Sequence, residues 1–333
     1  MKHVLIIRFS ALGDVAILAK IMQEYEIKGA QPVVLTKNNF RALFDSQKVK
    51  LPEVDTKKKH KGLAGLIRLH KELKKEYDIT EVLDLHNTLR SKIIKLLFAL
   101  NGISYKTIDK GKREKRKLAR KRNKIKRPLK TSKERYLEVL TKAKHIYLTK
   151  AVNSPNKGDI KQKQGEEKII IGIAPFAAHK TKEYPLEKTE KVISKLKPEK
   201  YEILIFGGGK KEKEVAEKWE QKYPHVRSII GKQDMTKEIE LMQKADLMIT
   251  MDSGNMHLAS LTDTKILVIW GATHPYMGFA GDSENRIDIQ IEMNCRPCSV
   301  FGEKKCRMNN LACMNLISES LIVNKIKELT KQM

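Results

Sequence analysis

Residues 3–22 read HVLIIRFSALGDVAILAKIM. The apolar run HVLII (3–7) is typical of a buried strand, and VAILAKIM (15–22) has the mainly apolar composition of a packed helix. Asp14 lies between them, directly after a glycine. A carboxylate at such a junction lies where α/β proteins bind ligands, although aspartate is also a common helix cap. The stretch predicts a strand–turn–helix unit in which Asp14 either caps the helix or carries chemistry.

The same alternation of apolar strands and amphipathic helices continues along the chain and restarts near residue 168. Further strands are predicted at 32–36, 80–86, 103–108, 168–175, 201–209, 245–254 and 264–271, and the helices of the first half at 15–28, 63–77 and 89–100. Strand-then-helix order in two blocks predicts two parallel-sheet α/β domains, which 333 residues can supply.

A polar stretch rich in Pro, Gly, Asn and Gln separates the two blocks and is the predicted linker. The expected organisation is an N-terminal domain at 1–150, a linker at 151–167, a C-terminal domain at 168–317 and a final helix at 318–333.

The positive charge is concentrated in the first half. Residues 1–150 hold 38 Lys and Arg against 15 Asp and Glu, whereas the remainder holds 29 against 25. A lysine-rich coding bias is the alternative explanation, but it would not favour one half. The segment 110–130 contains 13 basic residues and one acid, and a second basic cluster lies at 57–62. This asymmetry indicates an anionic partner for the first half.

Nucleic acid and anionic lipid both fit such a basic segment. Aromatic residues make up only 6% of the chain, and no recognised nucleic-acid module surrounds the segment. The prediction is therefore an anionic membrane surface and no nucleic acid. No secretory signal or run of about 20 apolar residues is present, so we expect a cytoplasmic protein, peripheral on the inner face of the membrane.

The second half contains motifs suited to phosphate. In TMDSGNMHLAS (250–260), Asp252, Ser253 and Gly254 separate a strand from a helix, whose free N–H groups favour an anion. An ordinary N-cap is the alternative. His257 either contacts the ligand or packs in the helix. Lys180 and Lys182 follow the strand that breaks at Pro175 and supply mobile positive charges.

The glycine-rich turn FGGGKKE (206–212) matches neither a dinucleotide fingerprint nor a P-loop, which argues against a dehydrogenase. A basic, non-catalytic nucleic-acid-binding protein would explain the charge but not the motifs around Asp14 and Asp252.

All four cysteines fall within 19 residues, as CRPC (295–298), Cys306 and Cys313. Two thiols at this spacing with two more nearby can form a tetrahedral zinc site. Cys306 and Cys313 do not form a second CxxC pair, so structural zinc, free thiols and disulfides all remain open. A redox role is less favoured.

Taken together, the chain resembles glycosyltransferase family 9, the lipopolysaccharide heptosyltransferases. The resemblance rests on RFSALGDV (8–15), DLHNTLRS (84–91), HKTKEYP (179–185), MDSGNMHLAS (251–260) and WGATHPY (270–276), which occur in the family's order, and on the cysteine-rich tail. It implies a GT-B fold, with two Rossmann-like domains facing a central cleft, the acceptor on the first domain and the nucleotide-sugar on the second. It also implies a C-terminal helix that packs back on the N-terminal domain.

The activity implied is inverting, metal-independent transfer of heptose from ADP-heptose to a lipid-linked glycan, the lipopolysaccharide inner core. The resemblance places the catalytic carboxylate at Asp14 and the phosphate-binding lysine at Lys182. The expected donor-binding residues are Lys180, Gly208, Met235, Asp252, Ser253, Gly254 and His257. The expected acceptor-binding residues are Arg8, Ser10, Lys59, Lys61, Arg90, Arg113, Arg116 and Arg120. No cofactor is required.

The chain departs from the family pattern on the donor side. Ala177 and Ala178 occupy positions of two hydroxyl residues, and the glycine-rich turn offers Lys210 where an acid is expected for the ribose. A GT-B transferase with another nucleotide-sugar and another glycan acceptor is therefore the alternative reading.

Overall fold

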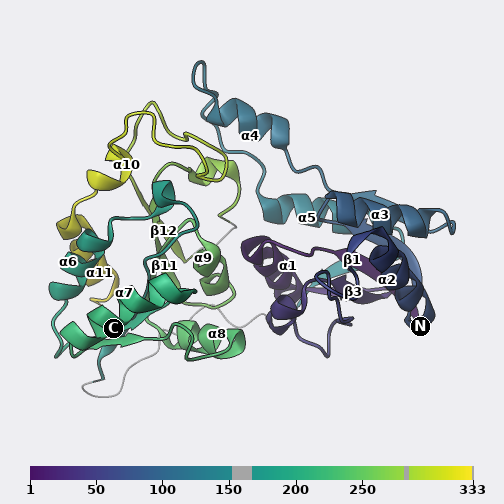
Figure 1. The fold of residues 1–333 in the computed structure, drawn as a ribbon, viewed down its shortest axis with the longest axis horizontal. Coiled ribbons are helices and arrows are strands. Elements are labelled where there is room, and N and C mark those ends of the chain that lie inside the picture. Colours follow the sequence, from purple (N-terminus) through teal and green to yellow (C-terminus); the bar gives the residue numbers. More distant parts are fainter. Residues whose placement is uncertain (152–166, 281–284, 332–333) are drawn as a thin grey trace. The chain divides into compact units, whose positions relative to one another are not determined.

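A computed structural model describes residues 1–151, 167–280 and 285–331. The predicted linker at 151–167 lies almost entirely outside the described residues. The chain divides into two compact units, one formed by Met1–Lys110 and Lys130–Ser154 and the other by Gly111–Leu129 and Pro155–Met333. Figure 1 labels their helices and strands.

The first unit is built on a four-stranded parallel sheet with the order β3-β1-β4-β5. Its strands are β1 (Lys2–Ile7), β3 (Gln31–Leu35), β4 (Asp78–Asp84) and β5 (Ser104–Thr107). Its helices are α1 (Leu12–Glu24), α2 (Gly62–Glu76), α3 (Leu89–Ala99) and α5 (Ser132–Thr141), with a 3₁₀ turn at Asn38–Leu43. The sheet forms because its strands are apolar on both faces: Leu5 and Ile6 of β1 point to opposite faces, and both are fully buried.

One predicted boundary in this unit is wrong. The helix expected at 15–28 ends at Glu24, and Tyr25–Lys28 forms strand β2, which pairs antiparallel with β6 (Tyr147–Lys150). Tyr25 and Ile27 favour a strand, and the pairing partner is more than 100 residues away in sequence. A local pattern cannot reveal such a partner.

The second unit contains a six-stranded parallel sheet with the order β12-β11-β10-β7-β8-β9. Its strands are β7 (Ile169–Ala174), β8 (Tyr201–Ile205), β9 (Val226–Ser228), β10 (Leu247–Met251), β11 (Lys265–Trp270) and β12 (Arg286–Gln290). Its helices are α6 (Leu186–Ser194), α7 (Lys210–Lys222), α8 (Met235–Lys244), α9 (Gly254–Ala259), α10 (Ala312–Asn315) and α11 (Glu319–Leu329), with 3₁₀ turns at Lys180–Lys182 and Pro275–Met277.

The C-terminal helix α11 packs within the second unit. Ile322, Val323 and Ile326 belong to the apolar core under this sheet, and α11 contacts α6. Three buried aliphatic residues on one face account for this packing, because they need an apolar partner surface. The expectation that this helix also returns to the N-terminal domain stays a prediction.

The basic segment also differs from expectation. Although 1–150 was predicted as one domain, residues 111–129, including helix α4 (Lys112–Ala119), group with the second unit. Leu118 and Ala119 are buried against Met277. In the sequence these apolar side chains stand among charged residues, so their burial was not expected. No described helix is long and apolar enough to cross a membrane.

Candidate functional site

Asp14 lies in the first turn of α1 but does not cap it. The N-cap residue is Ala11, which makes no side-chain capping bond. Instead the Asp14 carboxylate forms an ion pair with the guanidinium of Arg8. Arg8 is almost completely buried, whereas the Asp14 side chain keeps 30% of its surface exposed. The result is a carboxylate that is held from the protein side and open to solvent on the other.

The turn after β4 lies on the same side of the first sheet as Asp14, because β1 and β4 are parallel neighbours. The buried Asp84 carboxylate organises this turn by accepting hydrogen bonds from the backbone N–H groups of His86 (2.9 Å) and Asn87 (2.7 Å). Arg8 crosses to the turn and donates to the carbonyl of Leu85 at 2.7 Å.

Two further side chains of this region define its charge. Burial, helped by the positive charges of Arg8 and Lys110, lowers the pKa of His86 to about 3, so its imidazole is neutral at pH 7. The guanidinium of Arg90 lies 5.9 Å from the centre of the Phe9 ring. Three of the predicted acceptor residues therefore lie in this region. Arg8 contacts Asp14, and Arg90 contacts the Phe9 ring. Ser10 is half-buried on the loop between β1 and α1.

The other predicted acceptor residues lie elsewhere. Lys59 forms an exposed ion pair with Glu72 at 3.0 Å, and Lys61 is the exposed N-cap of α2. Arg113, Arg116 and Arg120 are exposed and belong to the second unit rather than the first.

In the second unit, the predicted phosphate residues do come together. Lys182 Nζ lies 3.3 Å from Asp252 Oδ2, and both side chains are nearly buried, with 12% and 8% of their surface exposed. Lys182 follows β7 and Asp252 follows β10, and these two strands are parallel neighbours. Lys180 lies on the same 3₁₀ turn but is exposed.

The turn after Asp252 does not have the bonding of an ordinary N-cap. Ser253 is the N-cap of α9, yet its hydroxyl lies 3.2 Å from the Thr250 hydroxyl and makes no capping bond. The Ser253 hydroxyl is therefore not committed to the first backbone N–H groups of α9, which starts at Gly254. His257 is buried within this short helix, 8% exposed, which agrees with a packing role.

Gly302 was missed from the sequence and controls the position of Lys182. It adopts a φ of +85°, and a Cβ atom at this position would lie 2.5 Å from Cγ of Lys182. The neighbouring Thr181 hydroxyl donates to the Gly302 carbonyl. The aliphatic stem of Lys182 therefore packs directly against this glycine, and a larger residue there would displace the ammonium group.

Glu212 is a second residue that the sequence reasoning missed. It lies in the first turn of α7, and its carboxylate accepts a hydrogen bond from the N–H of Gly208 at 2.7 Å. Burial and the nearby charge of Glu183 raise the pKa of Glu212. The resemblance leads us to expect the ribose-binding acid at position 210, which is a lysine. A glutamate in the first turn after a glycine-rich loop is the signal that would have found it. Gly208 itself is exposed, and Met235 begins α8 after β9.

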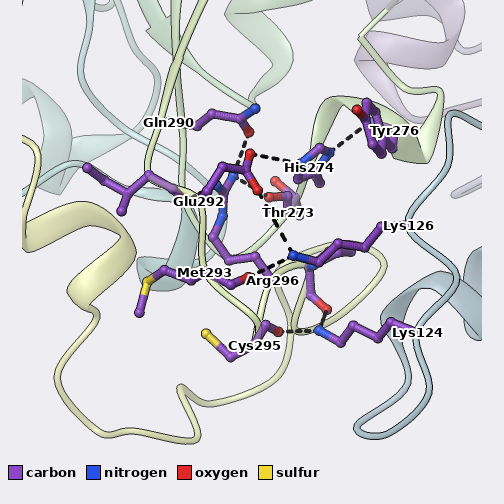
Figure 2. A network of polar contacts seen from close by, with 12 residues as sticks. Lys124, Lys126, Thr273, His274, Tyr276, Gln290, Glu292, Met293, Cys295 and Arg296 are labelled. Atoms are coloured by element: carbon purple, nitrogen blue, oxygen red, sulfur yellow. Dashed lines mark hydrogen bonds and ion pairs between the residues drawn. The ribbon is translucent and has the colours of Figure 1, made fainter.

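Three lysines fix the basic segment to loops of the second unit, and Figure 2 shows two of them, Lys124 and Lys126. Lys124 donates to the carbonyls of Cys295 and Pro297, and Lys126 donates to that of Met293. Lys115 is buried, with its ammonium group 4.0 Å from the centre of the Phe279 ring. These lysines have partners within the fold, and most of the other cations of the segment are exposed.

The same network continues inward from Lys126 (Figure 2). Arg296 is buried and donates to the carbonyl of Thr273 at 3.0 Å and to the Gln290 amide at 3.1 Å. His274 lies 3.8 Å from Glu292 and accepts a hydrogen bond from the N–H of Tyr276. These contacts join the loop after β11 to the loop after β12, to which the basic segment is bonded through Lys124 and Lys126.

All four cysteines are free thiols and line one cavity together with Met293, Met308 and Leu311. Burial and the neighbouring Cys295 raise the pKa of the Cys298 thiol to about 11. Among the described residues, no group of three or more His, Cys, Asp or Glu side chains is arranged to hold a metal ion. The four cysteines therefore lie around one cavity, and their metal content stays a prediction.

Comparison with known proteins gives consistent matches. Residues 66–311 match the model of glycosyltransferase family 9 (heptosyltransferase). Lipooligosaccharide heptosyltransferase 2 of Campylobacter jejuni is 26% identical over 168 residues, which are 49% of this chain and 52% of the relative. The chain therefore spans about half the length of the curated relatives it matches.

Solved structures resemble nearly the whole chain, among them the following two. The glycosyl transferase family 9 protein from Veillonella parvula superposes with a TM-score of 0.74 at 17% identity, covering 100% of this chain and 98% of that one. The heptosyltransferase WaaC of E. coli, solved with ADP-2-deoxy-2-fluoro heptose, gives 0.67 at 17% identity, covering 98% and 99%. At these identities the likeness establishes the fold, and it confirms the prediction of two Rossmann-like domains of the GT-B class.

Proposed function

Because the chain belongs to glycosyltransferase family 9, we propose that it transfers heptose from ADP-heptose to the inner core of a lipopolysaccharide by an inverting reaction. The donor is inferred from the ADP-heptose analogue bound to the E. coli structure and the acceptor from the C. jejuni relative. The observation that carries the proposal is Asp14, a half-exposed carboxylate that caps nothing and is held in place from behind.

In this mechanism Asp14 of the first unit acts on the acceptor, and Lys182 of the second unit acts on the donor. Asp14 takes the proton of the acceptor hydroxyl as its oxygen attacks the anomeric carbon. The bond from that carbon to the diphosphate breaks, and ADP leaves with the electron pair. Lys182 neutralises the charge that develops on the leaving diphosphate, so the scheme assigns this task to a side chain rather than to a metal ion. Glu212 is suited to accept hydrogen bonds from the ribose hydroxyls.

We expect Asp14→Asn to lower kcat by about 100-fold or more, because the amide preserves shape but cannot take a proton. Steady-state transfer from ADP-heptose to a purified core acceptor measures this loss, and ADP binding by calorimetry serves as the control. ADP should bind as in the parent protein. Near-full turnover in Asp14→Asn would exclude the proposed mechanism.

Lys182→Ala should weaken ADP binding by about 10- to 100-fold, because it removes a charge-assisted contact of roughly 1.5–3 kcal/mol. Gly302→Val should also weaken ADP binding, because the added side chain displaces Lys182 although the lysine itself is retained. Lys180→Ala is the matched control on the same turn and should have little effect. An unchanged ADP affinity in Lys182→Ala, with a loss in Lys180→Ala, would move the phosphate site to Lys180.

We also propose that the outward cations of the basic segment bind an anionic membrane or the phosphates of its lipid-linked acceptor. These exposed residues are Arg113, Arg116, Lys117, Arg120, Lys121 and Arg122. Each basic residue near an anionic surface contributes about 1 kcal/mol, so six suffice to localise the protein. Lys115 and Lys124 are not part of this surface, because their ammonium groups are used within the fold.

Changing these six residues to Gln should release the protein from vesicles containing anionic phosphatidylglycerol, as measured by sedimentation at about 0.1 M salt. A matched control changes six exposed lysines elsewhere on the second unit, namely Lys195, Lys197, Lys200, Lys211, Lys218 and Lys244. The control should still sediment. Equal binding by both variants would show that the segment is only a solvated surface.

Finally, we propose that the four cysteines hold a structural zinc ion. Four free thiols line one cavity, although the described side chains are not arranged to hold a metal, so the ion would have to draw the sulfurs together and displace their protons. The protein purified under reducing conditions should contain one equivalent of zinc by elemental analysis. Its removal by a chelator should lower the Tm by several degrees, and Cys298→Ser should reduce the zinc content. Metal-free protein with an unchanged Tm after chelation would contradict this.

A further inference from the structure

Two buried groups lie behind the Asp14 carboxylate. The first, Arg8, is only 5% exposed, and its guanidinium is divided between Asp14 and the carbonyl of Leu85. Because Arg8 is anchored at Leu85 on the neighbouring strand end, its position does not depend on Asp14 alone. A planar guanidinium fixed at two points sets the direction from which it can bind a carboxylate.

The second group is Tyr136 of α5. Its side chain is fully buried, with its ring 5.7 Å from the guanidinium carbon of Arg8. The described residues give the Tyr136 hydroxyl no hydrogen-bond partner with full geometry. The charges of Asp14 and Arg8 act on this hydroxyl, and Asp14 is the neighbouring group that could accept its proton in a hydrogen bond. A buried hydroxyl without a partner is costly, so this placement favours donation to Asp14.

The phenol can act only as a donor toward this carboxylate. Burial, together with the negative charge of Asp14, raises the pKa of Tyr136 well above its ordinary value. The proton therefore stays on the phenol across the pH range in which an enzyme works.

We propose that Arg8 and Tyr136 are positioning residues that hold the Asp14 carboxylate from inside the protein and leave its exposed side for the acceptor hydroxyl. This inference rests on the proposed role of Asp14 as the base. A catalytic carboxylate must be kept within a narrow range of orientations, and rigid neighbours reduce the freedom it would otherwise have. α1 and α5, which carry Asp14 and Tyr136, pack on each other and keep this arrangement fixed.

The test measures steady-state transfer in Tyr136→Phe, which keeps the buried ring and removes only the hydroxyl. We expect kcat to fall about 10-fold with an unchanged acceptor KM. Arg8→Met should lower kcat further, and Arg8→Lys should recover part of the loss because it restores the charge. Tyr105→Phe, at an exposed tyrosine of β5, is the matched control and should behave as the parent protein.

The double variant Asp14→Asn/Tyr136→Phe separates positioning from structure. If Tyr136 acts through Asp14, the double variant is no slower than Asp14→Asn alone. An additional 10-fold loss in that background, or an unchanged kcat in Tyr136→Phe, would overturn the inference. Should Arg8→Met fail to fold, Tyr136→Phe decides by itself. Full turnover in Asp14→Asn is a different result, because it would reject the proposed mechanism before this inference is reached.

Discussion

Both units depend on the parallel alignment of their strands. Strands that run in one direction end at the same edge of the sheet, so the turns that follow them are brought together whatever their distance in sequence. Lys182 and Asp252 are 70 residues apart and meet because β7 and β10 are neighbours. Arg8 reaches the turn after β4 for the same reason. The apolar strands supply stability, and the polar turns at their ends are left for chemistry.

Within these turns, buried polar groups fix the backbone conformation, whereas half-exposed polar groups remain available to a substrate. Asp84 is fully buried and its carboxylate is occupied by backbone N–H groups, so it shapes a turn and cannot act on a substrate. Asp14 is paired on one side and exposed on the other. The two aspartates differ in burial and partners rather than in residue type, and this difference separates a structural carboxylate from a candidate base.

The basic segment shows how composition can conceal two roles. Its lysines and arginines look equivalent in the sequence, yet Lys115, Lys124 and Lys126 are engaged by an aromatic ring and by backbone carbonyls of the second unit. Lysine can serve both purposes because its aliphatic stem packs against apolar surface while its ammonium group finds acceptors. The charge that is available to an anionic partner is therefore smaller than the net charge of the segment.

The sequence by itself determined the two α/β blocks, most strand positions and the candidate residues Asp14, Lys182 and Asp252. Apolar periodicity and motif order can be read from the sequence without knowledge of the fold. Only the tertiary structure decided that β2 pairs with β6, that α11 and residues 111–129 belong to the second unit, and that Gly302, Glu212 and Tyr136 lie beside the site residues. These features rest on contacts between residues far apart in the chain, and burial at such contacts is set by packing that no single segment encodes.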